Sequence, residues 1–457
     1  MSRERVEQEI RRFLDIGPVQ VAELDLDGAE AVLRPGPGSP PVTHGEVFLL
    51  VRRAGRPVGT LLGRVPQGAD PRTVLAGQAR KRIVQEPEPE PEPTAKTKAK
   101  ASPPPCTSVV IATRERSGQL AHALDSMLDQ DHPDFEIVVV DNAPVTDATR
   151  DLIERKYAER VRYVTEPVPG LAVAHNAGLA AARGEVVAFT DDDVVADPRW
   201  LTELTAPFAA DPGLGCATGL ILPARLRTPA QVLLESHGGF AKGFTARTYD
   251  PADPPADEPL FPFAAGRFGS GANMAFRTGV LRAVGGFDPA TGAGTLARGG
   301  DDLYGFVRVL AQGHRLHYTP QALVWHHHRE TWRDLETQAY GYGAGLTAYL
   351  TAILVDRPGL LPAFLARLPR GLAHARALTA VRDADTAGAP GGHDDRGHPW
   401  PRRLSRLQRR GMAYGPLGYL RARRALRGAA GPGAPTASGE PGEPGVPGEP
   451  GVPGGSR

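Results

Sequence analysis

Residues 107–190 alternate between short apolar runs and segments whose apolar residues recur every three or four positions, and this alternation limits the fold more than any other feature. Each apolar run suits a strand buried on both faces, and each periodic segment suits a helix. The predicted strands are residues 107–113, 136–140, 161–165 and 185–190, and the predicted helices are residues 117–128, capped by Ser117, 148–157 and 171–183. This order predicts an α/β domain with a mostly parallel, Rossmann-like sheet, right-handed crossovers and flanking helices.

Polar residues follow three of these predicted strands at the point where each strand ends. They are Thr113, Arg114, Asp141, Asn142, Asp191, Asp192 and Asp193. Ligands of such sheets bind beyond the carboxyl ends of the strands, so these residues are predicted to share one site. Three adjacent carboxylates repel one another, and a divalent cation such as Mg²⁺ or Mn²⁺ would balance them. An isolated triplet is more often an acidic turn, and agreement among three strand ends favours the site.

An ordered set of motifs resembles the bacterial-type family 2 glycosyltransferases of GT-A fold. The matching pieces are SVVIATRER, DFEIVVVDNAP, EPVPGLAVAHNAGLAAARGEVVAFTDDD, GSGANMAFR, GGFD and GGDDLYGFVRVLAQGHRLHYTPQALVWHHHRE, which together cover residues 108–330. The resemblance implies a GT-A domain over residues 106–330 that binds a nucleotide-diphosphate sugar.

The resemblance also implies which residues would contact the donor. The end of the first strand and the aspartate after the second hold the nucleotide base in this family, and the aspartate (DXD) motif holds ribose and metal-bound diphosphate. His175 stands where the family often has arginine, so a phosphate contact would fall to His175 or be absent. The implied donor-binding residues are Thr113, Arg114, Asp141, His175, Asn176, Asp191, Asp192 and Asn273, the last within the GSGANMAFR loop.

The resemblance places the metal on Asp193 and Asp191, and the general base within Asp301-Asp302. Asp302 is favoured as the base because it matches the second acidic residue of the family's usual pair. One base that removes a proton from an acceptor hydroxyl suffices for an inverting displacement without a covalent intermediate. The implied acceptor is a hydroxyl of a glycan, a lipid carrier or a metabolite, as in polysaccharide biosynthesis.

The run Trp325-His326-His327-His328 contains further candidate metal ligands. If this run is a strand, His326 and His328 share a face and His327 points away. A structural zinc site would need more Cys or His ligands, and Cys106 and Cys216 show no CxxC spacing. The resemblance implies that His326 or His328 completes the metal shell. Otherwise these histidines contact the metal ligands without binding the metal, or lie at the surface.

The remaining segments differ in composition from the central domain. Residues 1–84 are predicted to form a small β-rich accessory module, with two strands within residues 47–65, and residues 85–105 a Glu/Pro/Lys-rich linker that spaces it from the central domain. Residues 331–428 are predicted to form a helical, basic extension, and residues 429–457 a disordered tail. Within this tail glycine stands at every third position from Gly439 to Gly454, a period that also suits collagen. Residues 402–427 contain nine arginines and no acid among apolar residues, which suits either peripheral membrane contact or a solvated basic helix.

Global composition excludes some classes of function. Lys plus Arg (53) nearly balances Asp plus Glu (52), and no recognition motif accompanies the basic segment, so nucleic acid is not an expected partner. Two cysteines and no apolar signal core predict a cytoplasmic protein, peripheral at most at the inner face of the cell membrane. Two rival functions are a non-catalytic nucleotide-sugar-binding scaffold and a nucleotidyltransferase, which would need a Gly-rich, lysine-bearing loop where Thr113 to Arg116 stand.

Overall fold

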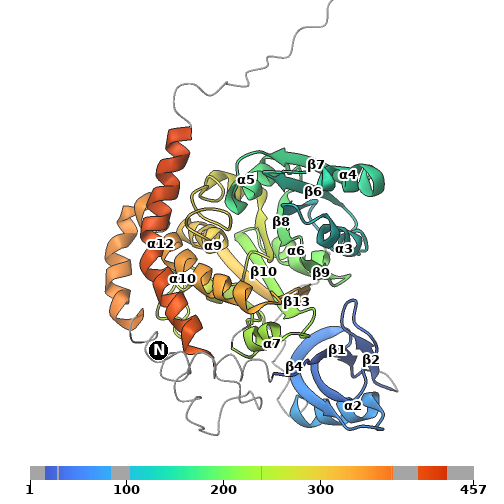
Figure 1. The fold of residues 1–457 in the computed structure, drawn as a ribbon. Helices are drawn as coiled ribbons and strands as arrows, with labels where there is room; N and C mark the ends of the chain where they lie inside the picture. Colours follow the sequence, from blue (N-terminus) through green and yellow to red (C-terminus); the bar gives the residue numbers. More distant parts are fainter. Residues whose placement is uncertain are drawn as a thin grey trace, which may run out of the picture.

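The computed structural model of the chain describes residues 16–27, 30–83, 103–237, 239–371, 373 and 400–429. The predicted linker up to residue 102 and the predicted tail after residue 429 lie outside these residues. The described part contains a central α/β domain, a small β-sheet module before it and helices after it (Figure 1).

The central domain is built on a nine-stranded sheet with the order β11-β13-β10-β12-β8-β5-β6-β7, and β9 pairs with β13. The strands are β5 (Thr107–Thr113), β6 (Phe135–Asn142), β7 (Val161–Glu166), β8 (Val186–Asp191), β9 (Val194–Ala196), β10 (Leu214–Pro223), β11 (Arg247–Tyr249), β12 (Asn273–Arg277) and β13 (Arg315–His326). The strands from β8 to β7 are parallel, which confirms the predicted half of the sheet. The other half is mixed, because β12 runs antiparallel to both β8 and β10.

Helices cover both faces of this sheet. They are α3 (Ser117–Leu128), α4 (Ala148–Leu152), α5 (Leu171–Ala181), α6 (Trp200–Ala210), α7 (Pro229–Ser236), α8 (Thr278–Ala283) and α9 (Asp301–Ala311), with a π-helical turn η1 (Ile153–Tyr157) and a 3₁₀ turn η2 (Ala265–Arg267). Alternate residues of β5 point to opposite cores: Val109 packs with Leu120 of α3 and Trp200 of α6, whereas Val110 packs with Leu179 of α5 and with α9. Ser117 is the first residue of α3 and not its cap, since Arg116 occupies the N-cap position without a side-chain cap bond.

The N-terminal module is a four-stranded sheet of order β2-β1-β3-β4 against which one helix packs. Its elements are β1 (Gln20–Asp25), β2 (Val32–Pro35), β3 (Gly45–Arg53), β4 (Arg56–Val65) and α2 (Pro71–Arg82). The prediction that the linker spaces this module from the central domain is wrong. The module lies beside β13 and α7 (Figure 1), and Arg52 pairs with Asp197 at 2.6 Å. Val19 also bridges to Leu226, so backbone and side chains both join the two parts.

Two long helices follow the central domain, α10 (Trp332–Asp356) and α12 (Arg402–Ala429), with a 3₁₀ turn η3 (Pro358–Leu360) after α10. They lie side by side along one flank (Figure 1) and approach closely where glycines face the partner backbone. Within the described residues no single helix has the length and apolar character to cross a membrane, whereas α10 together with residues 358–371, bent by 111°, meets that test as a pair.

Candidate active site

Three side chains that could bind a metal meet beyond the ends of β8 and β13. Asp191 ends β8, Asp193 follows two residues later, and His326 ends β13. One ligand atom from each lies within 4.8 Å of those of the other two. The short strand β9 causes this meeting, because Val194 pairs with His326 and so brings Asp193 beside the imidazole. His326 Nε2 lies 3.2 Å from Asp193 Oδ1 and 4.0 Å from Asp191 Oδ2.

The two carboxylates of this group have pKa values displaced in opposite directions. Burial and repulsion by Asp193 raise the pKa of Asp191 to about 6. Burial alone would also raise the pKa of Asp193, but His326 and two arginines outweigh it and hold that pKa well below its usual range. Burial acts to lower the pKa of His326, and the two aspartates outweigh it and raise it. The raised pKa of Asp191 indicates that its negative charge is not fully compensated, and a cation at this carboxylate would relieve the repulsion.

The donor set fits a divalent cation. Two carboxylates and one imidazole offer oxygen and nitrogen ligands of the kinds that Mn²⁺ and Mg²⁺ accept, and this set leaves room for oxygens of a bound diphosphate. Asp191 and His326 both line a cavity of about 1090 Å³, so the group is open to a ligand on that side. Asp191, Asp193 and His326 are the residues that would hold the ion.

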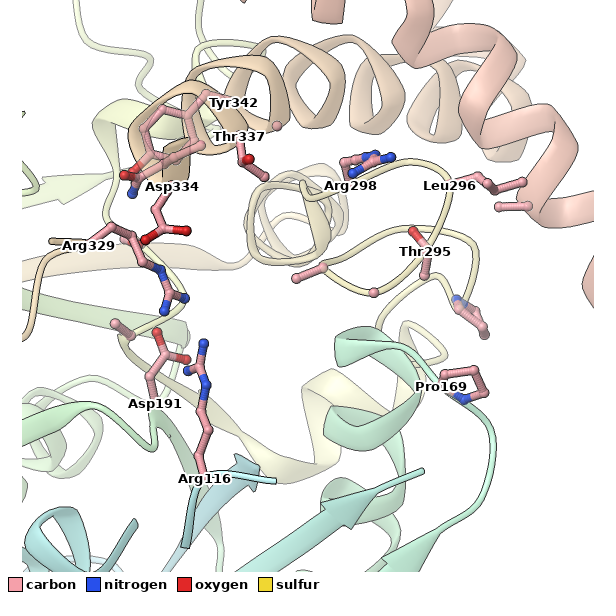
Figure 2. Close-up of a pocket in the computed structure, with 18 of the residues that line it drawn as sticks. Arg116, Pro169, Asp191, Thr295, Leu296, Arg298, Arg329, Asp334, Thr337 and Tyr342 are labelled. Atoms are coloured by element: carbon pink, nitrogen blue, oxygen red, sulfur yellow. The ribbon is translucent and has the colours of Figure 1, made fainter. Parts of the chain in front are cut away.

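Two arginines lie on either side of the acidic group. Arg116 pairs with Asp192 at 2.9 Å and with Asp193 at 3.4 Å, and Arg329 lies 3.9 Å from the same Asp193 carboxylate. Figure 2 shows both guanidinium groups turned toward Asp191 from opposite directions. Both arginines line the cavity and keep more than a third of their side-chain surface exposed. Neither arginine was predicted as a site residue from the sequence, although Arg116 lies in the same TRER run as Arg114, which was predicted to bind the donor.

Both carboxylate oxygens of Asp192 accept hydrogen bonds from protein side chains. Thr113 Oγ1 donates to Asp192 Oδ2 at 2.7 Å, and Arg116 donates to its other oxygen. Thr113 and Asp192 are both buried and join the end of β5 to the acidic turn, and their direct contacts with a donor stay a prediction. Arg114 is exposed on the same loop.

Asp141 is buried at the end of β6 with one oxygen free for a ligand. Tyr163 donates to Asp141 Oδ2 at 2.8 Å, and Oδ1 has no hydrogen-bond partner among the described residues. Burial raises the pKa of this carboxyl despite the tyrosine. Such an unpartnered acceptor fits the predicted contact with a nucleotide base.

The two aspartates that begin α9 face different surroundings. Asp302 is half-buried and accepts hydrogen bonds from the N–H groups of Gly271 (2.9 Å) and Leu303 (2.8 Å). Ser270 and Ala272, on either side of Gly271, line the cavity, so the hydrogen bond from Gly271 places Asp302 next to that part of the cavity. Burial, with repulsion by Asp301, raises the pKa of Asp302 to about 6. Asp301 is buried, with Oδ2 3.2 Å from His175 Nδ1, so its predicted catalytic role is not supported.

Three residues predicted to bind the donor are used inside the protein. His175 is buried between the rings of Phe189 and Phe287, at 5.0 and 5.2 Å between ring centroids. Asn176 exchanges two hydrogen bonds with the backbone of Phe287. Asn273 is fully buried, donates to the carbonyls of two neighbouring strands and accepts from Trp200. Protein partners or buried rings surround each of these side chains, so their direct contacts with a donor stay a prediction.

His328 lies behind His326 and not in the metal group. Its Nδ1 is 3.3 Å from His326 Nδ1 and its Nε2 is 3.0 Å from Glu235 Oε2, so both ring nitrogens face protein groups. Of the two alternatives for the histidine run, His326 fits the metal shell and His328 fits a supporting position. Glu235, on α7, had no signal in the sequence that linked it to this site.

The cavity extends from the acidic group to α12. At one end it is polar, with Arg116, Asp191, His326 and Arg329, and Asp334 and Tyr342 of α10 lie nearby (Figure 2). The other end is formed by loop residues before α5 and α9 and by α12: Val168, Pro169, Thr295, Leu296, Arg298, Ala422, Ala425 and Leu426. The C-terminal helix thus forms part of the wall of the candidate site.

Comparison with known proteins agrees with this geometry. Residues 108–281 match the family model described as glycosyl transferase family 2. A pre-mycofactocin glycosyltransferase of Mycobacterium tuberculosis is 27% identical over 266 residues, which are 56% of this chain and 52% of that protein. A validoxylamine A glucosyltransferase of Streptomyces hygroscopicus is 37% identical over 125 residues, which are 25% of this chain and 29% of the relative.

One more curated relative and one solved structure are also similar to this chain. An uncharacterized glycosyltransferase of Nostoc is 37% identical over 111 residues, 24% of this chain and 34% of the relative. Among solved structures, a mannosyltransferase of Pyrobaculum calidifontis in complex with GDP-Man and Mn²⁺ aligns over 75% of this chain and 94% of its own, with 23% identity and a TM-score of 0.42. The chain spans about half or less of the length of these curated relatives.

Proposed function

The domain that contains residues 108–281 belongs to glycosyl transferase family 2 and has the GT-A fold, and we propose that it transfers a sugar from a nucleotide-diphosphate donor to an acceptor hydroxyl with inversion. The observation that carries this proposal is the position of the Asp191, Asp193 and His326 group beside a large cavity that Asp302 also adjoins. A metal-diphosphate anchor and a carboxylate base are the two parts that such a transfer requires.

Asp302 is the proposed general base. As the acceptor oxygen forms its bond to the anomeric carbon, the bond from that carbon to the diphosphate oxygen breaks, and the hydroxyl proton passes to an oxygen of Asp302. The raised pKa brings this carboxyl closer to the pH at which a base works best. The N–H groups of Gly271 and Leu303 fix its orientation.

Inversion follows from the roles of the two aspartates at the start of α9. A retaining reaction through a covalent intermediate needs a carboxylate that attacks the sugar in addition to an acid or base. Asp301 is buried against His175, so it is not available to the sugar. The pair therefore supplies one reactive carboxylate, which suits a single displacement.

Arg116 and Arg329 would bind the departing diphosphate. Both line the cavity and both contact Asp193, so a diphosphate held at the acidic group lies within reach of either guanidinium. Arginine suits phosphate oxygens because its planar fork can donate two hydrogen bonds at once. A divalent cation, Mn²⁺ or Mg²⁺, when bound by Asp191, Asp193 and His326, supplies Lewis-acid stabilisation of the leaving diphosphate.

Peripheral membrane contact through residues 402–427 remains part of the proposal. Leu417 and Leu420 on α12 have 46% and 50% of their surface exposed, among the arginines of that helix. Exposed apolar residues beside cations suit the surface of an anionic membrane, where a lipid-linked acceptor would be found. Flotation with vesicles that contain anionic lipid tests this contact, and a protein that stays unbound at low salt contradicts it.

The function is tested with purified protein and a panel of nucleotide sugars. We expect one donor to raise the melting temperature in the presence of Mn²⁺ and to be hydrolysed slowly to the nucleoside diphosphate without an acceptor. Asp302→Asn should keep the thermal shift and lose the turnover. A protein that binds a donor but never turns it over, with or without acceptors, would instead be the non-catalytic scaffold.

A further inference from the structure

Four side chains form a continuous line of close polar contacts that ends in the candidate metal group. Glu235 Oε2 lies 3.0 Å from His328 Nε2, His328 Nδ1 lies 3.3 Å from His326 Nδ1, and His326 Nε2 lies 3.2 Å from Asp193 Oδ1. The line runs from α7 through the end of β13 to the acidic turn after β8. Glu235 does not line the cavity described above. The line connects it to His326 Nε2, the nitrogen that faces Asp191 and Asp193.

With an ionised glutamate and a neutral His328, only one arrangement of protons lets both the Glu235–His328 and the His328–His326 contacts be hydrogen bonds. An ionised glutamate only accepts, so His328 must carry its proton on Nε2. A neutral His328 then has a lone pair on Nδ1, which can only accept from His326. His326 must therefore keep a proton on Nδ1, and the lone pair that remains for a metal is on Nε2, the nitrogen that faces Asp191 and Asp193.

From this we propose that Glu235 and His328 are positioning residues that set the tautomer and the ring orientation of His326 for metal binding. The proposal rests on the metal site proposed above and extends it to two residues that do not touch the metal. A ligating histidine held through its other ring nitrogen is more basic and loses less freedom on binding. Here the support comes through a second histidine, with a carboxylate as the terminal acceptor.

The surroundings hold the line in place. The His328 side chain has 1% of its surface exposed and that of Glu235 has 9%. Gln231 Nε2 donates to the backbone oxygen of His328, and the Phe240 ring packs on both His326 and His328, with centroids 5.2 and 5.6 Å away. A Cβ atom at Gly239 would lie 2.3 Å from Glu235 Oε2, so the backbone closes directly over the carboxylate.

Mn²⁺ affinity, measured by electron paramagnetic resonance of the free ion without donor or acceptor, tests the proposal. We expect His328→Phe to weaken binding by about 10- to 100-fold, and Glu235→Gln by about 10-fold. His328→Asn places an amide oxygen near the former Nδ1, which can accept from His326, so it should recover most of the loss although it fills the space less well than Phe. A purely structural role for His328 predicts the reverse order.

His317→Phe is the matched control, because His317 lies on the same strand and pairs through Nδ1 with Thr248. It should leave Mn²⁺ affinity within about twofold of the unchanged protein, since it removes a histidine hydrogen bond remote from the metal group. Wild-type affinity in both Glu235→Gln and folded His328→Phe would overturn the proposal. A weakened His317→Phe would also overturn it, because the losses would then reflect strand stability.

Ring nitrogen-15 chemical shifts of the metal-free wild-type protein give a second test that needs no folded variant. We expect the proton of His328 on Nε2 and a proton on Nδ1 of His326. A His328 protonated on Nδ1 alone reverses the line and overturns the proposal. If the tautomers are as expected but Mn²⁺ does not bind, both the proposed metal site and the positioning role are rejected. If Mn²⁺ binds the wild-type protein and all the variants equally well, only the positioning role is rejected.

Discussion

His175 Nδ1 lies 3.2 Å from Asp301 Oδ2, and both side chains are buried beneath the helix that carries the proposed base. Neither atom has a hydrogen bond of good geometry in the described structure, so the two side chains interact through their proximity and not through a hydrogen bond. Asp301 is also the first residue of α9, where the helix dipole favours a negative charge. The contact thus links helix α5 to the start of α9, next to Asp302.

Removal of His175 should therefore destabilise the domain strongly. His175→Leu leaves the Asp301 carboxyl buried without the facing ring nitrogen, and a buried polar group that loses its partner costs about 1–3 kcal/mol. The double variant His175→Leu/Asp301→Leu buries neither group and should recover much of this loss. Urea unfolding of the four proteins measures the coupling, and strictly additive losses would show that the two side chains do not stabilise each other.

The raised pKa of Asp302 predicts a pH dependence of transfer. The ionised carboxylate is the active form of a base, so kcat/KM should rise with pH through an inflection near 6 and then level off. Rates are measured at saturating Mn²⁺, which holds Asp191 ionised and removes its titration from the profile. Asp302→Asn should lower the rate by about 10²- to 10⁴-fold and abolish the inflection. An unchanged inflection in that variant assigns it to another group.

The parallel half of the sheet and the acidic group could be predicted from sequence because both depend on local patterns. Apolar runs on β5, β6 and β8 are buried on both faces, and the ends of these strands converge as parallel topology requires. The edge strand β7 is mostly half-exposed, although its sequence was expected to be buried in the same way. The order of β12 and β13 was not predictable in the same way. Their pairing joins residues far apart in the chain, and β12 runs antiparallel between β8 and β10.

The differences between the predicted and the observed surroundings of the site residues have a common physical cause. Asn176 and Asn273 are polar residues in motifs, and the sequence does not show whether their partners are ligands or backbone. Arg116 and Glu235 were missed for the opposite reason, since each reaches the site through tertiary packing. Strand-end carboxylates were predictable, whereas the side chains that support or neutralise them required the fold.

Arg116 should have opposite effects on metal and on nucleotide binding. In the ligand-free arrangement it pairs with Asp192 and Asp193, so its charge opposes a cation at the same carboxylates. Arg116→Gln should leave Mn²⁺ affinity equal or higher. It should weaken nucleoside diphosphate binding in the presence of Mn²⁺ by about 10- to 100-fold, because a charged hydrogen bond contributes about 1.5–3 kcal/mol. Isothermal titration with each ligand separates the two effects. A joint loss of both affinities would mean that Arg116 mainly holds the acidic turn in shape.

The packing of α12 on α10 depends on glycines where the two backbones approach each other. A Cβ atom at Gly411 would lie 2.1 Å from the carbonyl oxygen of Tyr340, so Gly411→Ala must push the helices apart, at about 1–3 kcal/mol for overpacking. Gly428→Ala on the same helix meets no atom within 4 Å and gains about 1 kcal/mol of helix propensity.

Because Ala422 and Leu426 of α12 line the cavity, displacement of the helix should reach the site. Tyr419 strengthens this coupling, since its hydroxyl donates to Asp288 at 2.8 Å in the loop that leads to α9. We expect Gly411→Ala to speed hydrogen exchange in α12 and to lower transfer, with Mn²⁺ affinity kept because the metal group is on the central sheet. Gly428→Ala should change neither exchange nor transfer. Equal transfer by both variants would show that α12 covers the cavity without shaping it.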